Sequence, residues 1–327
     1  MLRSTQLPEV KRRVPFWLTF VPLVVGVAGY YALWSGYADA FRTEVAAILP
    51  HRTVTIGGFP YRVAVSVDAP ALGLAGPGLS ASVSAAAGAA DRGPWRPELT
   101  VVRLTQPRLR VAVMPVDRAT FALSAPAALS SVHLARGRLV RLSTVFDHPR
   151  FSIGFIPGEI SADRLEVHLR ETPTDRAVAG VTPPVQGEVV LAGSAVRIAG
   201  GDPVALAATV SITATAPLHS VADWAKGGTV EITHLALTDA SGEVLAFAAS
   251  GIAANHGNLQ LAGTIDTVCP ASVAAAFAGL VATPEERLRR PVRLAFNGAP
   301  GALAMTLPET SSLDRRKQLP PCPLLRR

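Results

Sequence analysis

Histidine is the residue of this chain best suited to metal binding or acid–base catalysis, and the spacing of its histidines supports neither role. They form no H-x-H, H-E-x-x-H or Cys/His metal pattern. A G-x-S-x-G nucleophile elbow, an S-x-x-K pair and a phosphate loop are also absent from the sequence. We therefore predict a non-enzymatic protein without cofactor or metal, and a hydrolase assembled from distant residues is the alternative. The histidines are His51, His133, His148, His168, His219, His234 and His256.

Cysteine occurs at two positions, Cys269 and Cys322. In an oxidising compartment the two thiols can pair and close a loop of ~54 residues, worth roughly 4 kcal/mol in the chain-entropy model. Cys322 lies in a proline-rich tail without hydrophobic periodicity, so two unpaired thiols are the alternative.

An apolar segment near the N-terminus determines where the protein works. Residues 14–38 contain no charged side chain, and Lys11, Arg12 and Arg13 stand directly before them. As a helix, the first 20 of these residues would reach ~30 Å, the thickness of the hydrocarbon layer of a bilayer. The positive-inside rule leaves residues 1–13 in the cytoplasm and sends the chain after Ala38 across the membrane.

A cleaved secretory signal is the alternative to a retained anchor. Ala38-Asp39-Ala40 fits the A-x-A cleavage pattern, and the basic n-region is present. The apolar run is longer than the ~7–15 residues of a usual signal sequence, which favours the anchor. Both interpretations export the remainder of the chain, and a buried helix of a soluble protein is the third, weaker one.

The formal net charge of +7 suggests nucleic-acid binding until the charges are located. Residues 1–13 contribute +3 and residues 309–327 contribute another +3, which leaves +1 for the body of the protein. A nearly neutral body without a motif for base recognition predicts no nucleic-acid partner.

Alternation of apolar and polar residues is the dominant pattern beyond Tyr61. Leu165, Val167 and Leu169, for example, alternate with charged residues and histidine, which predicts a strand with one buried face. Residues 229–267 predict a three-stranded meander, with a β-bulge at Thr233-His234 where the apolar phase slips by one residue.

The fold class predicted is mainly β (α+β): a transmembrane helix followed by an antiparallel β-meander ectodomain with a few short helices. We expect helices at 271–282 and 283–290, the second with Thr283 as N-cap and Pro284 at its first position. The predicted organisation is a cytoplasmic tail (1–13), an anchor (14–38), an N-terminal β-rich half (39–170), a linker (171–184), a C-terminal β-rich half (185–308) and a flexible tail (309–327).

Two motifs resemble those of a known family. The first is Gly57-Gly58-Phe59-Pro60-Tyr61-Arg62, which follows the apolar helix and leads into a strand. The second is Trp224-Ala225-Lys226-Gly227-Gly228, followed by the meander, and Trp95 is a third, weaker match. Over most of residues 14–308 the chain resembles a bacterial envelope family known as domain of unknown function 2125. Its long meander is similar, more weakly, to AsmA-like envelope proteins, whose open β-sheets curve into a gutter for lipid tails.

The resemblance implies an inner-membrane protein that faces the periplasm, and it supplies no catalytic residues. At the matching positions we expect roles in specifying the fold. Gly57 and Gly58 would form a tight turn that Pro60 stiffens, with Phe59 and Tyr61 packed into the core. The glycine pair that follows Trp224, Gly227-Gly228, would end a short helix.

The leading functional hypothesis is a membrane-anchored envelope protein that binds a lipid or another amphipathic ligand on an apolar sheet face. The alternative is a scaffold for envelope protein partners. An apolar sheet face without a covering layer would distinguish the first hypothesis from the second.

Overall fold

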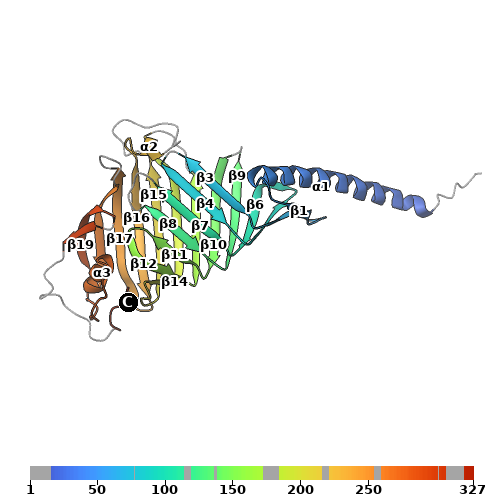
Figure 1. The fold of residues 1–327 in the computed structure, drawn as a ribbon. Helices are drawn as coiled ribbons and strands as arrows, with labels where there is room; N and C mark the ends of the chain where they lie inside the picture. Colours follow the sequence, from blue (N-terminus) through green and yellow to red (C-terminus); the bar gives the residue numbers. More distant parts are fainter. Residues whose placement is uncertain are drawn as a thin grey trace, which may run out of the picture.

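The computed structural model describes residues 16–76, 78–113, 119–135, 138–171, 184–215, 221–253, 259–300, 302–306 and 320–327. One long helix leads into a bent antiparallel β-structure that makes up most of the chain (Figure 1). The predicted mainly-β class is therefore confirmed. The cytoplasmic tail predicted for residues 1–13 lies outside the described residues.

The first helix runs without interruption from the apolar segment to the sheet. A short 3-10 turn, η1 (Phe16–Phe20), precedes α1 (Val21–Ile48). The helix is long and apolar enough to cross a membrane, and its apolar window is not covered by the rest of the protein. The Ala38-Asp39-Ala40 pattern lies inside α1, and Ala38 itself is buried.

The twenty strands of the described residues join one hydrogen-bonded network in which two layers can be distinguished. The long layer has the order β1-β2-β5-β6-β9-β10-β13-β14-β15-β16-β17-β18-β19-β20. The short layer has the order β3-β4-β7-β8-β11-β12 and ends on the last residues of β14. Every pairing is antiparallel. Up to β14 the chain visits both layers, and beyond it only the long layer continues.

The strands of the described residues are short, most of them four to twelve residues long. They are β1 (Val54–Gly57), β2 (Val63–Asp68), β3 (Ala71–Gly76), β4 (Leu79–Ser84), β5 (Ala87–Gly93), β6 (Arg96–Thr105), β7 (Arg108–Val113), β8 (Thr120–Ser124), β9 (Ala127–Ala135), β10 (Arg138–Asp147), β11 (Arg150–Ile153), β12 (Ile156–Ser161), β13 (Arg164–Glu171), β14 (Val185–Ile198), β15 (Val204–Thr213), β16 (Thr229–Asp239), β17 (Gly242–Ala253), β18 (Leu259–Thr267), β19 (Val292–Ala299) and β20 (Ala302–Thr306).

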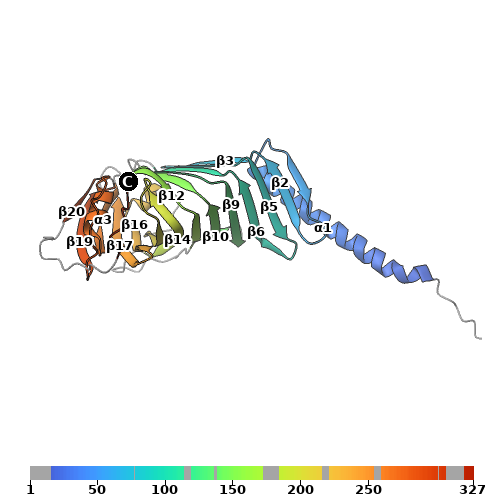
Figure 2. The ribbon, with the colours of Figure 1, turned by 90° about the horizontal axis from the view of Figure 1, so that it is seen from below.

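The layers are joined along a line of sharp bends, which we call the crease. At each bend the chain passes from one layer to the other through two residues that belong to no strand. Figure 2 shows the result, with β3 in a layer folded over the long strands β5, β6 and β9. The bends are Ala69-Pro70, Ala85-Ala86, Gln106-Pro107, Ala125-Pro126, His148-Pro149 and Ala162-Asp163, and β14 bends at Ala195.

Backbone hydrogen bonds stabilise the crease against a local conformational cost. Ala69, Gln106 and His148 have φ angles of 46°, 50° and 44°, and each precedes a proline. A left-handed residue with a Cβ costs roughly 1–2 kcal/mol, so other contacts must hold these bends. Each of their amides donates to a carbonyl of the neighbouring bend. The pairs are Ala69 to Ala86, Gln106 to Pro126 and His148 to Asp163, at 3.0, 2.8 and 2.8 Å.

The bends turn the apolar faces of the two layers toward each other. In the long layer the paired residues Val67, Gly88, Leu104, Ala128, Phe146 and Leu165 share the inner face. In the short layer the corresponding row is Leu72, Val83, Leu109, Leu123, Phe151 and Ile160. The inward residues on the two sides of a bend are always five positions apart in the sequence, so the alternation changes phase at every bend.

The outer face of the long layer is polar. Arg103 pairs with Asp91, and the guanidinium of Arg293 donates to both carboxylate oxygens of Asp266, at 2.8 and 2.9 Å. The hydrogen bonds from Arg293 lower the pKa of Asp266, against a smaller opposing effect of burial. These charged side chains lie on the face opposite the interior between the two layers.

The predicted meander and its irregularity are confirmed. Strands β16, β17 and β18 pair in sequence, and the pairing of β16 with both neighbours shifts at Thr233-His234. The linker predicted for 171–184 lies almost entirely at 172–183, outside the described residues. Strands β13 and β14 on its two sides are neighbours in the long layer.

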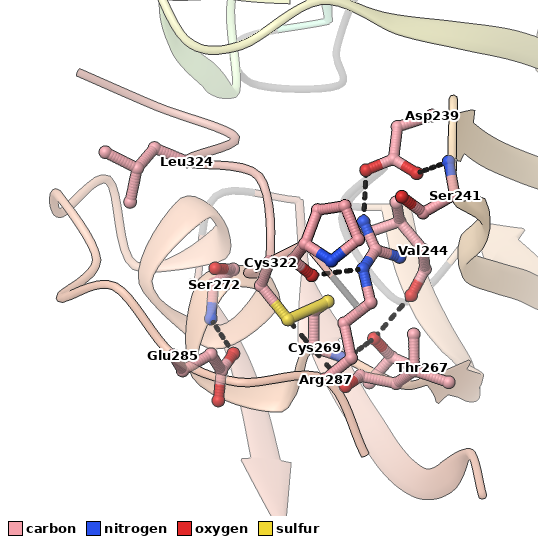
Figure 3. The surroundings of a disulfide bond; sticks show 12 residues. Asp239, Ser241, Val244, Thr267, Cys269, Ser272, Glu285, Arg287, Cys322 and Leu324 are labelled. Carbon is pink, nitrogen blue, oxygen red and sulfur yellow. Dashed lines mark hydrogen bonds and ion pairs between the residues drawn. A yellow bond between two sulfur atoms is a disulfide. The ribbon is translucent and has the colours of Figure 1, made fainter. Parts of the chain in front are cut away.

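Beyond β14 the inner face of the long layer is covered by a helix instead of a second layer of strands. Helix α3 (Pro270–Phe277) packs its buried Val273 into the main core, and the Phe277 ring stacks on Phe247 at 6.1 Å. The C-terminal segment, residues 320–327, lies beside this helix and is joined to it by the disulfide Cys269–Cys322 (Figure 3).

Several interactions fix the C-terminal segment. The buried guanidinium of Arg287 pairs with Asp239 and donates to the carbonyl of Pro320 at 3.2 Å. The Asp202 carboxylate accepts hydrogen bonds from the Leu324 amide at 2.9 Å and from Arg327 at 2.6 Å. The flexible tail predicted for 309–327 is therefore wrong for residues 320–327, because local sequence carries no sign of these distant partners.

The second helix predicted in the 271–290 region is also wrong. Helix α3 ends at Phe277, and residues 283–290 have no helical turn. Glu285, in the expected first turn, has a carboxylate that accepts the Ser272 amide at 2.8 Å, and its carbonyl accepts the Cys322 amide at 2.9 Å. Hydrogen bonds that Glu285 accepts from α3 and from the C-terminal segment therefore take the place of a local helical turn.

Replacing both cysteines tests how much the disulfide stabilises this end. A Cys269→Ser/Cys322→Ser double variant frees a loop closed over a sequence separation of 53, which should lower the free energy of unfolding by about 2–4 kcal/mol. Urea unfolding of the full chain in detergent, followed by circular dichroism, measures this difference. The wild type should lose the same amount when reduced, and equal stability of reduced and oxidised protein would contradict the expectation.

Candidate functional site

The last turns of α1 cover the inner face of the first strands. Trp34, Ala38 and Phe41 are buried against Val63 and Val65 of β2 and form a small core separate from the main one. Because these buried residues lie on both sides of the Ala38-Asp39-Ala40 pattern, the last turns of α1 belong to the core of the β-rich domain, and the first turns form the apolar segment.

Arg92 closes this small core with a charged group on the inner face. Its guanidinium lies 4.3 Å from the centre of the Phe41 ring, a cation–π distance. It donates to Glu44 of α1 at 2.9 Å and to the Thr100 hydroxyl at 3.1 Å. The inward guanidinium of Arg92 therefore joins α1 to β5 and β6.

The Gly57–Arg62 turn attaches the sheet to α1 near Tyr30 and Trp34, where the apolar segment ends. The Tyr30 hydroxyl donates to the Pro60 carbonyl, and the Trp34 indole donates to the Arg62 carbonyl at 2.9 Å. The Phe59 ring lies between Tyr30, Tyr31 and Trp34, with ring-centre distances of 6.0, 5.4 and 5.3 Å. The motif is thus a clamp on α1.

The positions of two aromatic residues in this motif differ from the sequence prediction. Tyr61 does not pack into the core: 87% of its surface is exposed. Phe59 is also partly exposed and packs on α1 rather than on the sheet core. The prediction was wrong because the turn faces the helix, whose position relative to the strands cannot be read from alternation.

In the second motif, Trp224 to Gly228, the last glycine packs closely against the indole of Trp224. Trp224 ends the short helix α2 (Val221–Trp224), and its indole donates to the Thr229 carbonyl at 3.2 Å. Gly227 has a φ of 131°, and a Cβ on Gly228 would lie 2.3 Å from the Trp224 ring. The glycine pair therefore ends the helix and lets Trp224 lie over the start of β16.

The inner face is left partly uncovered at the end nearest α1. Along one inward row of the short layer, Leu123, Phe151 and Ile160 are buried, whereas Leu72 at the edge is exposed. In the next row Leu74 has 64% of its surface exposed. Leu79, on the neighbouring strand β4, is exposed as well.

We call these three inward leucines of β3 and β4 (Leu72, Leu74 and Leu79) the open apolar face. The sequence analysis did not identify them. Their Leu-x-Leu spacing is visible in the sequence, but only the crease shows that they point inward.

A shallow apolar hollow lies beside α1 in the same part of the molecule. Leu23, Val24, Val27, Ala28 and Tyr31 of the helix form one wall, and Phe59 of the turn forms the other. Its lining carries almost no polar surface. The hollow suits a hydrocarbon chain and offers nothing to an ion.

The described part of the chain brings together no three residues of His, Cys, Asp and Glu that could hold a metal ion. His168 lies 3.5 Å from Glu166 on the outer face, away from the open apolar face. His219 and His256 lie outside the described residues. The arrangement can therefore offer apolar contact, and we identify no residues for a chemical step.

Alanine at the two glycines of the first motif gives a matched test of the clamp. A Cβ on Gly58 (φ 98°) would lie 2.7 Å from the Arg62 carbonyl oxygen, whereas a Cβ on Gly57 meets nothing within 4 Å. We expect Gly58→Ala to lower the free energy of unfolding by roughly 1–3 kcal/mol and Gly57→Ala to leave it nearly unchanged. Denaturation of the full chain in detergent compares them, and equal losses would contradict this role of the turn.

Comparison with known proteins gives one match. Curated proteins and solved structures show no match to this chain. A family model described as an uncharacterized protein conserved in bacteria (DUF2125) matches residues 43–266. The match begins in the last turns of α1 and includes the Gly57–Arg62 clamp, the crease and the Trp224 motif. It covers more than half of the chain, so the protein belongs to this bacterial family.

Proposed function

We propose that this protein is a non-enzymatic, membrane-anchored binder of lipid hydrocarbon, and that the open apolar face is where the ligand lies. The observation that carries the proposal is the rise in side-chain exposure across the short layer toward its edge strand β3. Leu123 of β8 is buried, whereas Leu74 of β3 has 64% of its surface exposed. Burial of a leucine side chain is worth about 1.5–3 kcal/mol, so a chain that covers the three leucines gains several kcal/mol.

The location supports a ligand from the bilayer. Helix α1 leaves the sheet at the end where β1 and β2 lie, and the open apolar face belongs to that end of the short layer (Figure 2). The hollow between α1 and Phe59 provides apolar surface at the same end. In this proposal α1 crosses the inner membrane with its basic N-terminal side in the cytoplasm, and the sheet lies in the periplasm.

A scaffold role is the second candidate, and one observation favours it. Strand β3 pairs with β4 alone among the described strands, and all six of its residues are exposed. An exposed edge of this kind accepts a strand from a partner protein.

Retention of the apolar segment can be tested by mass spectrometry of the mature protein. Cleavage after Ala40 would remove Trp34 and Ala38 from the small core and expose Val63 and Val65. We therefore expect an intact N-terminal segment in protein isolated from membranes. A mature chain that begins at Phe41 would exclude the anchor.

Photo-crosslinking tests ligand binding directly. A benzophenone side chain at Leu74, in full-length protein in native membranes, should form adducts with lipid. The matched control is Leu129, which is also exposed (48%) but lies on the outer face of the long layer. Lipid adducts at both positions or at neither would contradict the proposal, and protein adducts at position 74 would favour the scaffold role.

Binding strength gives a second readout at the same position. Leu74→Gln removes one leucine from the contact and should weaken retention of a lipid by about tenfold, from a loss of ~1.5 kcal/mol. Leu129→Gln should leave retention unchanged. Native mass spectrometry of the full chain released from nanodiscs compares the two variants.

A further inference from the structure

Two turns of the sheet that carry aromatic residues lie beside Tyr30 of α1, and their outer rings are exposed. One is the Phe59-Pro60-Tyr61 turn before β2, and the other contains Trp95 between β5 and β6. Tyr61 and Trp95 have 87% and 79% of their surfaces exposed. The fold leaves these large rings unburied although both turns contact α1.

Ring contacts place the two turns at one level of the helix. Tyr30 stacks on Trp95 with a ring-centre distance of 6.5 Å and lies 6.0 Å from Phe59. Phe59 also lines the apolar hollow with residues as far down the helix as Leu23. The turns are therefore beside the apolar part of α1 and not beside its charged end.

The distance along the helix gives this level a depth. Tyr30 precedes the first charged residue of α1, Asp39, by nine positions. At ~1.5 Å per residue, Tyr30 is ~13 Å closer to the membrane centre than that charge. A hydrocarbon layer of ~30 Å that begins near Val14 ends close to Leu33. Residues in contact with Tyr30 then lie at the boundary between hydrocarbon and headgroups.

The side chains of the turns suit that boundary. Tyrosine and tryptophan prefer the headgroup level because their rings combine an apolar body with a polar group. Each turn is followed by an exposed arginine, Arg62 and Arg96, whose charge attracts lipid phosphate.

We propose that Tyr61, Trp95 and the arginines beside them dock on the bilayer surface and form a membrane contact in addition to α1. The contact rests on α1 crossing the membrane but not on the binding of a lipid to the open apolar face. With α1 and two turns embedded, the sheet cannot tilt freely, and its β1–β3 end is held at the bilayer.

Spin-label depth measurements on the full chain test this contact. Because Cys269 and Cys322 are joined, one introduced cysteine gives one label. We would label Tyr61→Cys and Trp95→Cys, with Leu129→Cys as an exposed control on the outer face and Leu23→Cys as a marker within the apolar segment. Each variant is placed in phosphatidylcholine/phosphatidylglycerol nanodiscs, and the accessibility of the label to oxygen is compared with its accessibility to a water-soluble nickel chelate.

The expected ratio of oxygen to nickel accessibility is highest at position 23, intermediate at 61 and 95, and lowest at 129. Ratios at 61 and 95 equal to the ratio at 129 would overturn the docking contact while leaving the anchor intact. A low ratio at position 23 would refute the membrane span and the docking contact together. Lipid adducts at Leu74 are measured separately, so failure of the docking contact is distinguishable from failure of lipid binding.

Discussion

The crease is the constraint on which the rest of the structure depends. Six times in its described part the chain leaves one layer and enters the other through two residues, and backbone hydrogen bonds join each bend to a neighbouring bend along this line. Without the bends, the long hairpins would form a single open sheet with a complete apolar face exposed to solvent. With them, each strand pair supplies both walls of an interior, so a chain with few aromatic residues builds a core from two facing layers.

The same constraint explains how far the fold could be predicted from the sequence. Alternation predicts individual strands because it needs only the local period, and the β16 bulge was visible as a phase slip at Thr233-His234. The crease is also a phase slip, since inward residues such as Leu104 and Leu109 are five apart. A phase slip alone does not distinguish a bulge within one layer from a bend between two layers. For that reason the two walls, and with them the open apolar face, were not predicted.

Long-range contacts account for the other differences. The Cys322 segment has no periodicity, and its order comes from partners more than a hundred residues away, such as Asp202. Glu285 lies in the first turn of the helix expected after Thr283, but its carboxylate accepts the amide of Ser272 in α3. Tyr61 looks like a core residue of a strand because its neighbours alternate, yet it belongs to a turn that faces α1. In the first two cases a tertiary partner outweighs the local preference, and in the third the packing of the turn against α1 leaves Tyr61 outside the core.

The location of the open apolar face follows from the order of the elements. The long layer extends beyond the short one at both ends: strand β1 has no counterpart in the short layer, and neither do the strands after β14. At the far end α3 and the disulfide-linked segment fill the space left by the missing layer. At the near end α1 covers β1 and β2, but it then continues away from the sheet as the apolar segment, and among the described residues Leu74 on the edge strand β3 keeps 64% of its surface exposed. The inner face that the described residues leave partly uncovered therefore belongs to the end of the sheet from which the apolar helix departs.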